Sequence, residues 1–320
     1  MKPYVLQLEP AWKDNIWGGR RLIDEFHMNC SLERAAEAWV LSCHKDGQSR
    51  VKNGSLAGLS LSDAIDRMGR ECLGERGCRF DFFPLLIKFI DARDDLSVQV
   101  HPDDEYALRV EGGYGKTEMW YVMDSDPGAK LYYGFTRPLT KEEYVRRIRE
   151  NTLLEVLNAV EVQRGDVFFI PAGTIHAIGK GLLIAEIQQN SNTTYRVYDY
   201  GRRDSQGNTR ELHIDKALDV TALGPAPVSV LPKEILREDA RVQTLADCPY
   251  FTTQKVQLDG AVHWTSGPDS FQALLCMGGD GVLELAGEAT DFHRGDCLFI
   301  PASSGEFVLR GQASLLLAQV

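Results

Sequence analysis

The sequence predicts a mainly β protein, built from two related β-modules with a small helical portion. Most segments are short alternating or apolar runs that end at Gly, Asp, Asn or Pro, as in FFPLLIKFIDA, KLYYGF and GDVFFIP. Such runs are typical of antiparallel sandwiches and barrels. Two stretches have helical patterns, 60–74 and 140–157, and one segment near the end of the chain repeats an earlier one.

The composition is that of an ordinary globular protein. Of the 320 residues, 43% are hydrophobic and 25% are charged, so the chain can bury a sizeable core. The formal net charge of −11 argues against nucleic acid as a partner, because no basic field surrounds the molecule. We expect no membrane association, because no apolar stretch approaches the ~20 residues of a span. The seven cysteines form no CxxC pair, which favours reduced thiols in a cytoplasmic protein.

Both helical stretches begin at capping signals. The first starts at about Ser60, with Asp63 in the capping-box position, and the second starts at Thr140, with Glu143 in that position. In a capping box, the first side chain accepts a hydrogen bond from the backbone three residues later. A further Thr-x-x-Glu at 152–155 predicts another short helix. We expect these helices to cover a sheet face.

One internal repeat is visible. VQRGDVFFIPAGTIHAIGKG, from Val162, aligns with FHRGDCLFIPASSGEFVLRG, from Phe292, at an offset of 130 residues. In each copy the Gly-Asp pair predicts a turn before a buried strand, and the Pro-Ala pair ends that strand. His176 of the first copy falls opposite Glu306 of the second. We infer two related modules, of which only the first keeps this histidine.

The repeat and one Pro-rich segment define the expected domains. We predict a catalytic domain over 1–230, including the helical segments, and a related C-terminal domain over 231–320 without a metal site. The stretch 224–232, GPAPVSVLP, contains three prolines in nine residues. It is the expected linker.

Four residues set among the β-type runs can act as metal ligands. Gln99 and His101 are two apart, so on a strand they point to the same face. Glu118 begins an aromatic and β-branched run, and His176 follows a turn, a strand and a Pro-Ala-Gly loop. A lone histidine on a strand is more often an ordinary packed group, so the hypothesis depends on the whole set. Imidazole, carboxylate and amide groups from separate strands suit a divalent ion such as zinc with an open position.

The element G-D-x-x-x-I-P-A-G-x-x-H is similar to the second cupin motif, and the Gln-x-His and later Glu complete a cupin metal set. Beyond this, the chain resembles the type I phosphomannose isomerase family in its short bacterial form. The resemblance is carried by KDNIWGGRRL, EAWVLSCH, PLLIKFIDARDDLSVQVHPDD, GKTEMWYV and RGDVFFIPAGTIHAIGKGLLIAEIQQNSNTTYRVYDYGR. It departs from the family in AAEAWVLSCH, which lacks the Gly usual before the Glu-x-Trp element. The resemblance implies two cupin-type jelly-roll β-barrel modules.

The resemblance also implies a site and a reaction. It implies that one zinc ion per chain is held by Gln99, His101, Glu118 and His176. It implies catalytic roles for Arg196, Glu186, Lys116 and Lys88, and substrate binding by Trp17, Lys88, Lys116 and Arg196. The expected activity is that of a mannose-6-phosphate isomerase, a zinc-dependent interconversion of mannose 6-phosphate and fructose 6-phosphate by proton transfer through an enediolate. The expected partner is therefore a phosphorylated hexose, and the expected state is a monomer or homodimer.

The residue types fit these roles. The planar fork of Arg196 can bind enediolate or phosphate oxygens. On a regular strand, Arg196 would share a face with Thr194 and Tyr198. A carboxylate such as Glu186, or a lysine with a lowered pKa, can move the proton. The sequence does not decide which group is the base.

Two other interpretations compete with the isomerase. One is a different metal-dependent cupin enzyme, such as a dioxygenase or decarboxylase. Redox cupins usually present three His and one Glu, whereas this chain offers one fewer His and a Gln. The other is a sugar-binding cupin without turnover, which the retained ligands and the Arg196 segment argue against.

Overall fold

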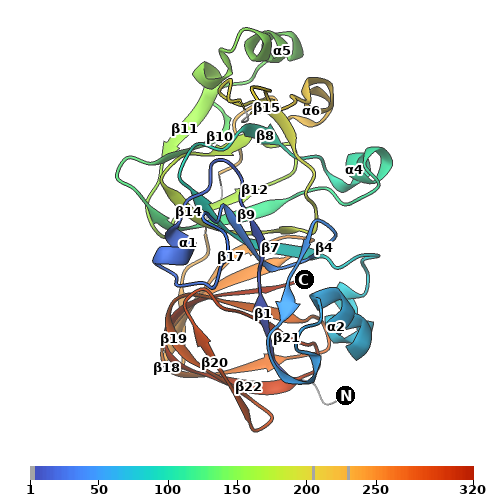
Figure 1. Ribbon diagram of the computed structural model, residues 1–320, viewed down its shortest axis with the longest axis vertical. Coiled ribbons are helices and arrows are strands. Elements are labelled where there is room, and N and C mark those ends of the chain that lie inside the picture. The colour runs from blue at the N-terminus through green and yellow to red at the C-terminus, as the bar shows by residue number, and fades with distance from the viewer. Residues whose placement is uncertain (1–3, 204–205, 229–230) are drawn as a thin grey trace. The chain divides into compact units, whose positions relative to one another are not determined.

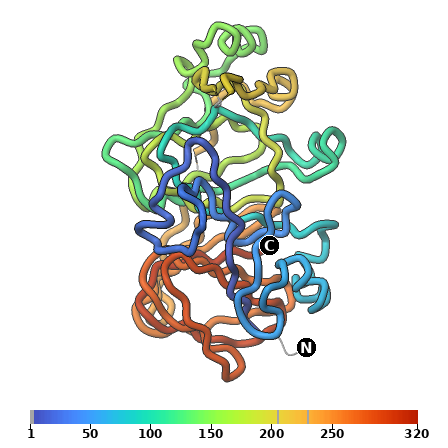
Figure 2. The backbone as a smooth tube through the Cα atoms, viewed as in Figure 1, coloured from blue at the N-terminus to red at the C-terminus, as the bar shows by residue number. Residues whose placement is uncertain are grey.

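The computed structural model describes residues 4–203, 206–228 and 231–320 (Figures 1 and 2). The protein is mainly β, as predicted, and its chain forms two compact units. The first unit comprises residues 1–14, 20–89 and 230–320, and the second comprises 15–19 and 90–229. In the described residues, no helix is both long and apolar enough to cross a membrane. All seven cysteines are free thiols.

This division differs from the expected domains, because residues 20–89 group with the C-terminal segment and not with the residues that follow them. The strand β7 (Leu85–Ala92) carries the chain from the first unit into the second. Within the expected linker 224–232, residues 229 and 230 lie outside the described residues. The assignment of catalysis to 1–230 stays a prediction.

The first unit is dominated by a nine-stranded antiparallel sheet. Its strands are β1 (Leu6–Glu9), β6 (Arg50–Val51), β16 (Ile235–Arg237), β17 (Ala240–Asp247), β18 (Thr252–Ser266), β19 (Gln272–Leu285), β20 (Glu288–His293), β21 (Cys297–Ile300) and β22 (Gly305–Gln319). They are ordered β16-β17-β18-β22-β19-β21-β1-β6, with β20 paired to β19. Alternate residues of β18, such as Val256, Leu258, Val262 and Trp264, enter one buried apolar cluster, as expected for a sheet with one face in the core.

Smaller elements complete the first unit. β2 (Ala11–Lys13) pairs with β3 (Glu37–Leu41), and β4 (Cys43–His44) pairs with β5 (Gly47–Gln48). The helices are α1 (Arg21–Asp24), η1 (Gly54–Leu56), α2 (Leu61–Met68), η2 (Arg70–Leu73) and α3 (Gly74–Gly77).

Among its described residues, the second unit contains eight further strands and four helices. The strands are β8 (Val98–Val100), β9 (Glu118–Ser125), β10 (Lys130–Phe135), β11 (Leu157–Glu161), β12 (Val167–Ile170), β13 (His176–Ile178), β14 (Leu182–Gln189) and β15 (Tyr195–Tyr198). The helices are α4 (Asp104–Val110), α5 (Lys141–Arg149), η3 (Leu153–Val156) and α6 (Ile214–Val220). A five-stranded sheet has the order β11-β10-β13-β8-β15, and β9 lies between β12 and β14.

Helices α5 and α6 cover one face of the five-stranded sheet, as Figure 1 shows. Val98 and Val100 of β8 pack in the same apolar cluster as Tyr144 of α5 and Ala217 of α6. Because side chains alternate along a strand, Gln99 of β8 lies on the opposite face. That second face carries the candidate site.

The predicted helical stretches exist but are interrupted. The Ser60 side chain accepts a hydrogen bond from the Asp63 N–H at 3.1 Å, and Thr140 accepts one from Glu143 at 3.2 Å, which confirms both caps. The first stretch divides into α2 and η2 at Gly69, whose φ is +94°, and into η2 and α3 at Gly74, whose φ is +78°. The second stretch divides into α5 and η3. Thr152, the predicted cap of the further short helix, makes no side-chain hydrogen bond at the start of η3.

The two copies of the sequence repeat fold alike. The turn glycine has a φ of +97° at Gly165 and +94° at Gly295. In each copy its N–H donates to the neighbouring strand at 2.8 Å. The following carboxylate accepts from a backbone N–H three residues earlier, at 2.8 Å for Asp166 and 2.9 Å for Asp296. The strands β12 and β21 then begin at equivalent positions, which confirms the inferred relationship between the modules.

Candidate metal centre and active site

His101, Glu118 and His176 come together in the second unit, each from a different element. His101 follows β8, Glu118 opens β9 and His176 opens β13. Their ligand atoms all lie within 4.8 Å of one another, and the three side chains are buried. Nε2 of His176 is 3.3 Å from Glu118 Oε1, and Nε2 of His101 is 3.8 Å from Glu118 Oε2. No second group of three such ligands occurs in the residues that the structure describes.

Backbone carbonyls fix which ring nitrogens face the centre of this trio. Nδ1 of His101 lies 2.9 Å from the Thr193 carbonyl oxygen, and Nδ1 of His176 lies 2.9 Å from that of Thr174. A carbonyl only accepts, so each Nδ1 carries the proton and each Nε2 presents a lone pair.

The electrostatics of His176 also suit a metal ligand. Burial, and then the ammonium of Lys116, lowers the pKa of His176 to about 3, so the ring is neutral. Its buried Nε2 has no hydrogen-bond partner within the described part of the chain. Two imidazoles and one carboxylate at this spacing fit a divalent metal ion.

Lys116 connects the trio to a second carboxylate. Its Nζ lies 2.6 Å from Glu118 Oε2, 3.1 Å from His101 Nε2 and 3.4 Å from Glu186 Oε1. The indole N–H of Trp120 donates to the other oxygen of Glu186 at 2.9 Å. A buried lysine and glutamate that contact each other beside the candidate metal centre can transfer a proton.

Gln99, His176 and Arg196 form a row across the five-stranded sheet. Gln99 is directly opposite His176 on one side and Arg196 on the other. Residues paired in this way point to the same face, with Cβ atoms about 5 Å apart. The row therefore brings Gln99 and Arg196 to the face of the sheet that carries His176.

The prediction that Arg196 and Tyr198 share one face of β15 is wrong. The β15–β8 register shifts between these two residues, so that Tyr198 lies opposite Val98. Val98 belongs to the apolar cluster, and Tyr198 packs against that cluster. The β-bulge therefore turns Tyr198 away from the face that Arg196 occupies.

The structure gathers guanidinium side chains around Asp199 that no sequence motif predicts. Arg202 and Arg210 form ion pairs with this carboxylate at 2.5 and 2.6 Å. Burial, and then the charge of Arg210, lowers the pKa of Arg196. Two guanidinium groups share one carboxylate, and the charge of Arg196 lies near them, so this part of an acidic chain is locally positive. No regular spacing in the sequence marks Arg202 and Arg210, because a loop brings them to Asp199.

The two remaining expected site residues lie in different units. Lys88 belongs to the first unit, where its Nζ is 3.5 Å from Glu37 Oε2 and 5.1 Å from the centroid of the Trp39 ring. Trp17 belongs to the second unit, where its side chain is buried and its carbonyl accepts the Arg93 N–H at 3.0 Å. Their catalytic and substrate-binding roles stay predictions.

The C-terminal module has different side chains at the positions of the trio. Glu306 replaces His176, and its cross-strand partner is Thr265, whereas the partner of His176 is Gln99. Glu306 is exposed, whereas His176 is buried.

The C-terminal module also carries a different residue at the position equivalent to Glu118. Glu118 is opposite Ile170 of β12, and its counterpart Gln272 is opposite Ile300 of β21. The Gln272 side chain donates to the Thr265 carbonyl at 3.0 Å. A neutral amide bound to the backbone thus stands where the first copy has a carboxylate.

Fold and site together define a protein of the cupin class with a buried cluster that fits a divalent metal ion. The model of "Phosphomannose isomerase type I, catalytic domain" matches residues 5–127, and that of "Mannose-6-phosphate isomerase, cupin domain" matches 241–320. Mannose-6-phosphate isomerase ManA of Bacillus subtilis (strain 168) is 39% identical over 316 residues, which cover 98% of either chain. Mannose-6-phosphate isomerase of Streptococcus mutans is 38% identical over 311 residues, which cover 97% of this chain and 96% of that protein.

Solved structures agree with these relatives. The crystal structure of mannose 6-phosphate isomerase from Bacillus subtilis has 34% sequence identity and a TM-score of 0.92, and the match covers 100% of both chains. A mannose 6-phosphate isomerase crystallised with bound zinc and yttrium shares the fold, with 16% identity, a TM-score of 0.77 and 98% coverage of both chains. The chain belongs to the type I phosphomannose isomerase family.

Proposed function

We propose that this chain is a mannose-6-phosphate isomerase, which interconverts mannose 6-phosphate and fructose 6-phosphate. The observation that carries the proposal is the buried trio of His101, Glu118 and His176 with the Lys116–Glu186 pair beside it. Membership of the family supports it, because relatives with this name align along nearly the whole chain.

The trio, with Gln99 as a weaker neutral ligand, would hold one zinc ion per chain. Two imidazoles, a carboxylate and an amide oxygen leave room for a substrate oxygen or water. The metal, when bound, supplies positive charge that polarises substrate oxygens and stabilises negative charge on them. The hydrogen bonds from both Nδ1 atoms to carbonyls support this role, because they aim each Nε2 at the ion.

We assign the proton transfer to Lys116 and Glu186. In the forward direction a proton leaves C2 of the aldose and is returned to C1, while a hydroxyl proton passes from O2 to O1. One member of the pair takes up the proton from carbon, and the other stabilises the charge that develops on it. Their separation of 3.4 Å supports this division of roles.

Binding of the phosphate group requires a local positive site, because the chain as a whole has a formal net charge of −11. Arg196, Arg202 and Arg210 offer such a site near Asp199. Of the three arginines, Arg196 lies in the same cross-strand row as His176. We therefore assign it to binding the oxygens on the reacting carbons of the substrate. Arg202 and Arg210 are then the candidates for the phosphate.

The test is an isomerase assay on the purified protein, combined with metal analysis before and after chelation. We expect one divalent ion per chain, loss of turnover on chelation and recovery with zinc. Free mannose should be a far poorer substrate than its 6-phosphate. A metal-replete protein that does not convert mannose 6-phosphate would contradict the proposed activity. Comparable turnover of free mannose would contradict the phosphate requirement alone.

A further inference from the structure

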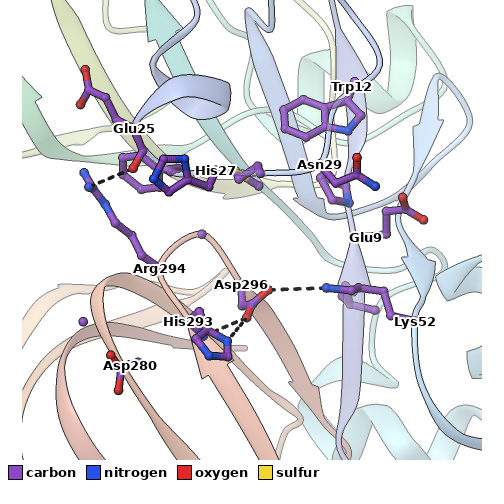
Figure 3. Close-up of a pocket in the computed structure, with 16 residues that line it drawn as sticks. Glu9, Trp12, Glu25, His27, Asn29, Lys52, Asp280, His293, Arg294 and Asp296 are labelled. Atoms are coloured by element: carbon purple, nitrogen blue, oxygen red, sulfur yellow. Dashed lines mark hydrogen bonds and ion pairs between the residues drawn. The ribbon is translucent and has the colours of Figure 1, made fainter.

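The first unit contains a pocket of about 540 Å³, lined only by residues of that unit (Figure 3). One wall is the loop 25–29, which follows α1. The facing wall is the turn 293–296, the second copy of the repeated Gly-Asp turn. The corner 8–12, between β1 and β2, together with Lys52, Gly279 and Asp280, completes the lining. The volume falls within the range of about 300–1,000 Å³ that is usual for small-molecule sites, and no residue assigned above to catalysis lines it.

Contacts between the two walls hold this pocket open. The Arg294 guanidinium lies 3.7 Å from the centroid of the Phe26 ring, and it donates to the Glu25 carbonyl at 3.3 Å. On the other side, Lys52 lies 3.7 Å from the Asp296 carboxylate. In Figure 3, Arg294 of the turn reaches the loop at Glu25, and Lys52 lies beside Asp296. A pocket formed in advance lowers the ordering cost of binding.

The charges of the lining exclude the phosphorylated substrate. Four carboxylates and two cationic side chains line the pocket, so a phosphosugar dianion is repelled. A simple cation gains little, because two of the carboxylates already have partners. Asp296 pairs with Lys52, and Glu25 pairs with Arg21 at 3.0 Å. The favoured ligand is therefore uncharged.

An aromatic ring, an amide and a carboxylate on one side of the pocket identify the ligand class. Trp12, Asn29 and Glu9 lie together on that side in Figure 3. A pyranose has a C–H face, which packs on an aromatic ring, and a rim of hydroxyls, which bond to amides and carboxylates. We propose that this pocket binds an uncharged saccharide, separately from the phosphorylated hexose of the active site.

The experiment measures binding of a mannobiose, of methyl mannoside and of spermidine to the full-length, metal-loaded protein by calorimetry and ligand-observed NMR. We expect both saccharides to bind and spermidine not to. Trp12→Ala should weaken saccharide binding by about tenfold or more, and Trp12→Phe should weaken it less. Neither variant should change kcat/KM for mannose 6-phosphate. Glu9→Gln tests the same pocket with a smaller change of side chain. The exposed Glu161→Gln, outside the pocket, is its matched control.

Three outcomes would overturn the proposal. One is that neither saccharide binds to the wild-type protein. The second is saccharide binding that persists undiminished in Trp12→Ala with a native melting transition. The third is tight spermidine binding that Glu9→Gln removes, since the pocket would then select an organic cation. If Trp12→Ala does not fold, Trp12→Phe and Glu9→Gln decide the same question.

Discussion

Replacing Lys116 by methionine tests the charge balance of the metal centre. The Lys116 ammonium lies 2.6 Å from Glu118 and 3.4 Å from Glu186, and its side chain is only 5% exposed. Removing one partner of a buried ion pair leaves a buried charge uncompensated, which costs about 3–5 kcal/mol. We expect the metal-free Lys116→Met variant to lose that much free energy of unfolding. The metal-loaded variant should lose less, because the ion compensates Glu118.

Lys216 provides a matched control for this change. Its ammonium also lies 2.6 Å from a carboxylate, that of Glu111, but its side chain is 44% exposed. Ion pairs in contact with solvent contribute about 0–1 kcal/mol. The same substitution, Lys216→Met, should therefore cost no more than about 1 kcal/mol. The difference between the two variants isolates the effect of burial.

The assay is urea denaturation of both variants, each with and without bound metal. Equal losses for Lys116→Met and Lys216→Met in the metal-free state would show that burial does not strengthen the Lys116 ion pairs. Steady-state kinetics add a separate readout, since loss of an acid–base group should lower kcat by about 100-fold or more. Unchanged turnover of metal-replete Lys116→Met would remove Lys116 from the proton transfer.

Three further predictions concern the ligands, the second module and the arginine. His176→Ala should abolish metal retention after dialysis and Gln99→Ala should weaken it, as measured by elemental analysis; full metal content in the first would disprove its role as a ligand. Glu306→Gln should leave turnover nearly unchanged, and a large loss of rate with intact folding would show that the C-terminal module takes part in the chemistry. Arg196→Lys should lower kcat and kcat/KM at least about tenfold, or about 1.4 kcal/mol, because lysine keeps the charge but loses the fork; unchanged kcat in a zinc-replete variant would limit Arg196 to positioning.

The metal-ligand trio could be predicted because local sequence patterns determine where its residues lie. The Gly-Asp turn before β12 and the Pro-Ala-Gly loop after it determine where His176 begins the next strand. The Gln-x-His spacing depends only on strand alternation. The structure accordingly brings His101, Glu118 and His176 within 4.8 Å of one another.

The features that could not be predicted depend on contacts between distant residues. The bulge after Arg196 arises from pairing with β8, about which the run YRVY carries no signal. Residues 20–89 group with the C-terminal segment through contacts that no local pattern records. Long-range pairing, and not propensity, decides each of these outcomes.

The duplicated turn gives the molecule a ready framework for an engineered second metal centre. Gly267 follows Thr265 by two residues, as His101 follows Gln99, and a Cβ added at Gly267 would meet no atom within 4 Å. The transplanted ligand set would be Thr265→Gln, Gly267→His, Gln272→Glu and Glu306→His. Strand register and turn geometry need no redesign, because the C-terminal module already shares them with the first. Such a variant should retain two metal ions per chain where the parent retains one, and a protein that still retains one would show that matched backbone alone does not make a ligand cage.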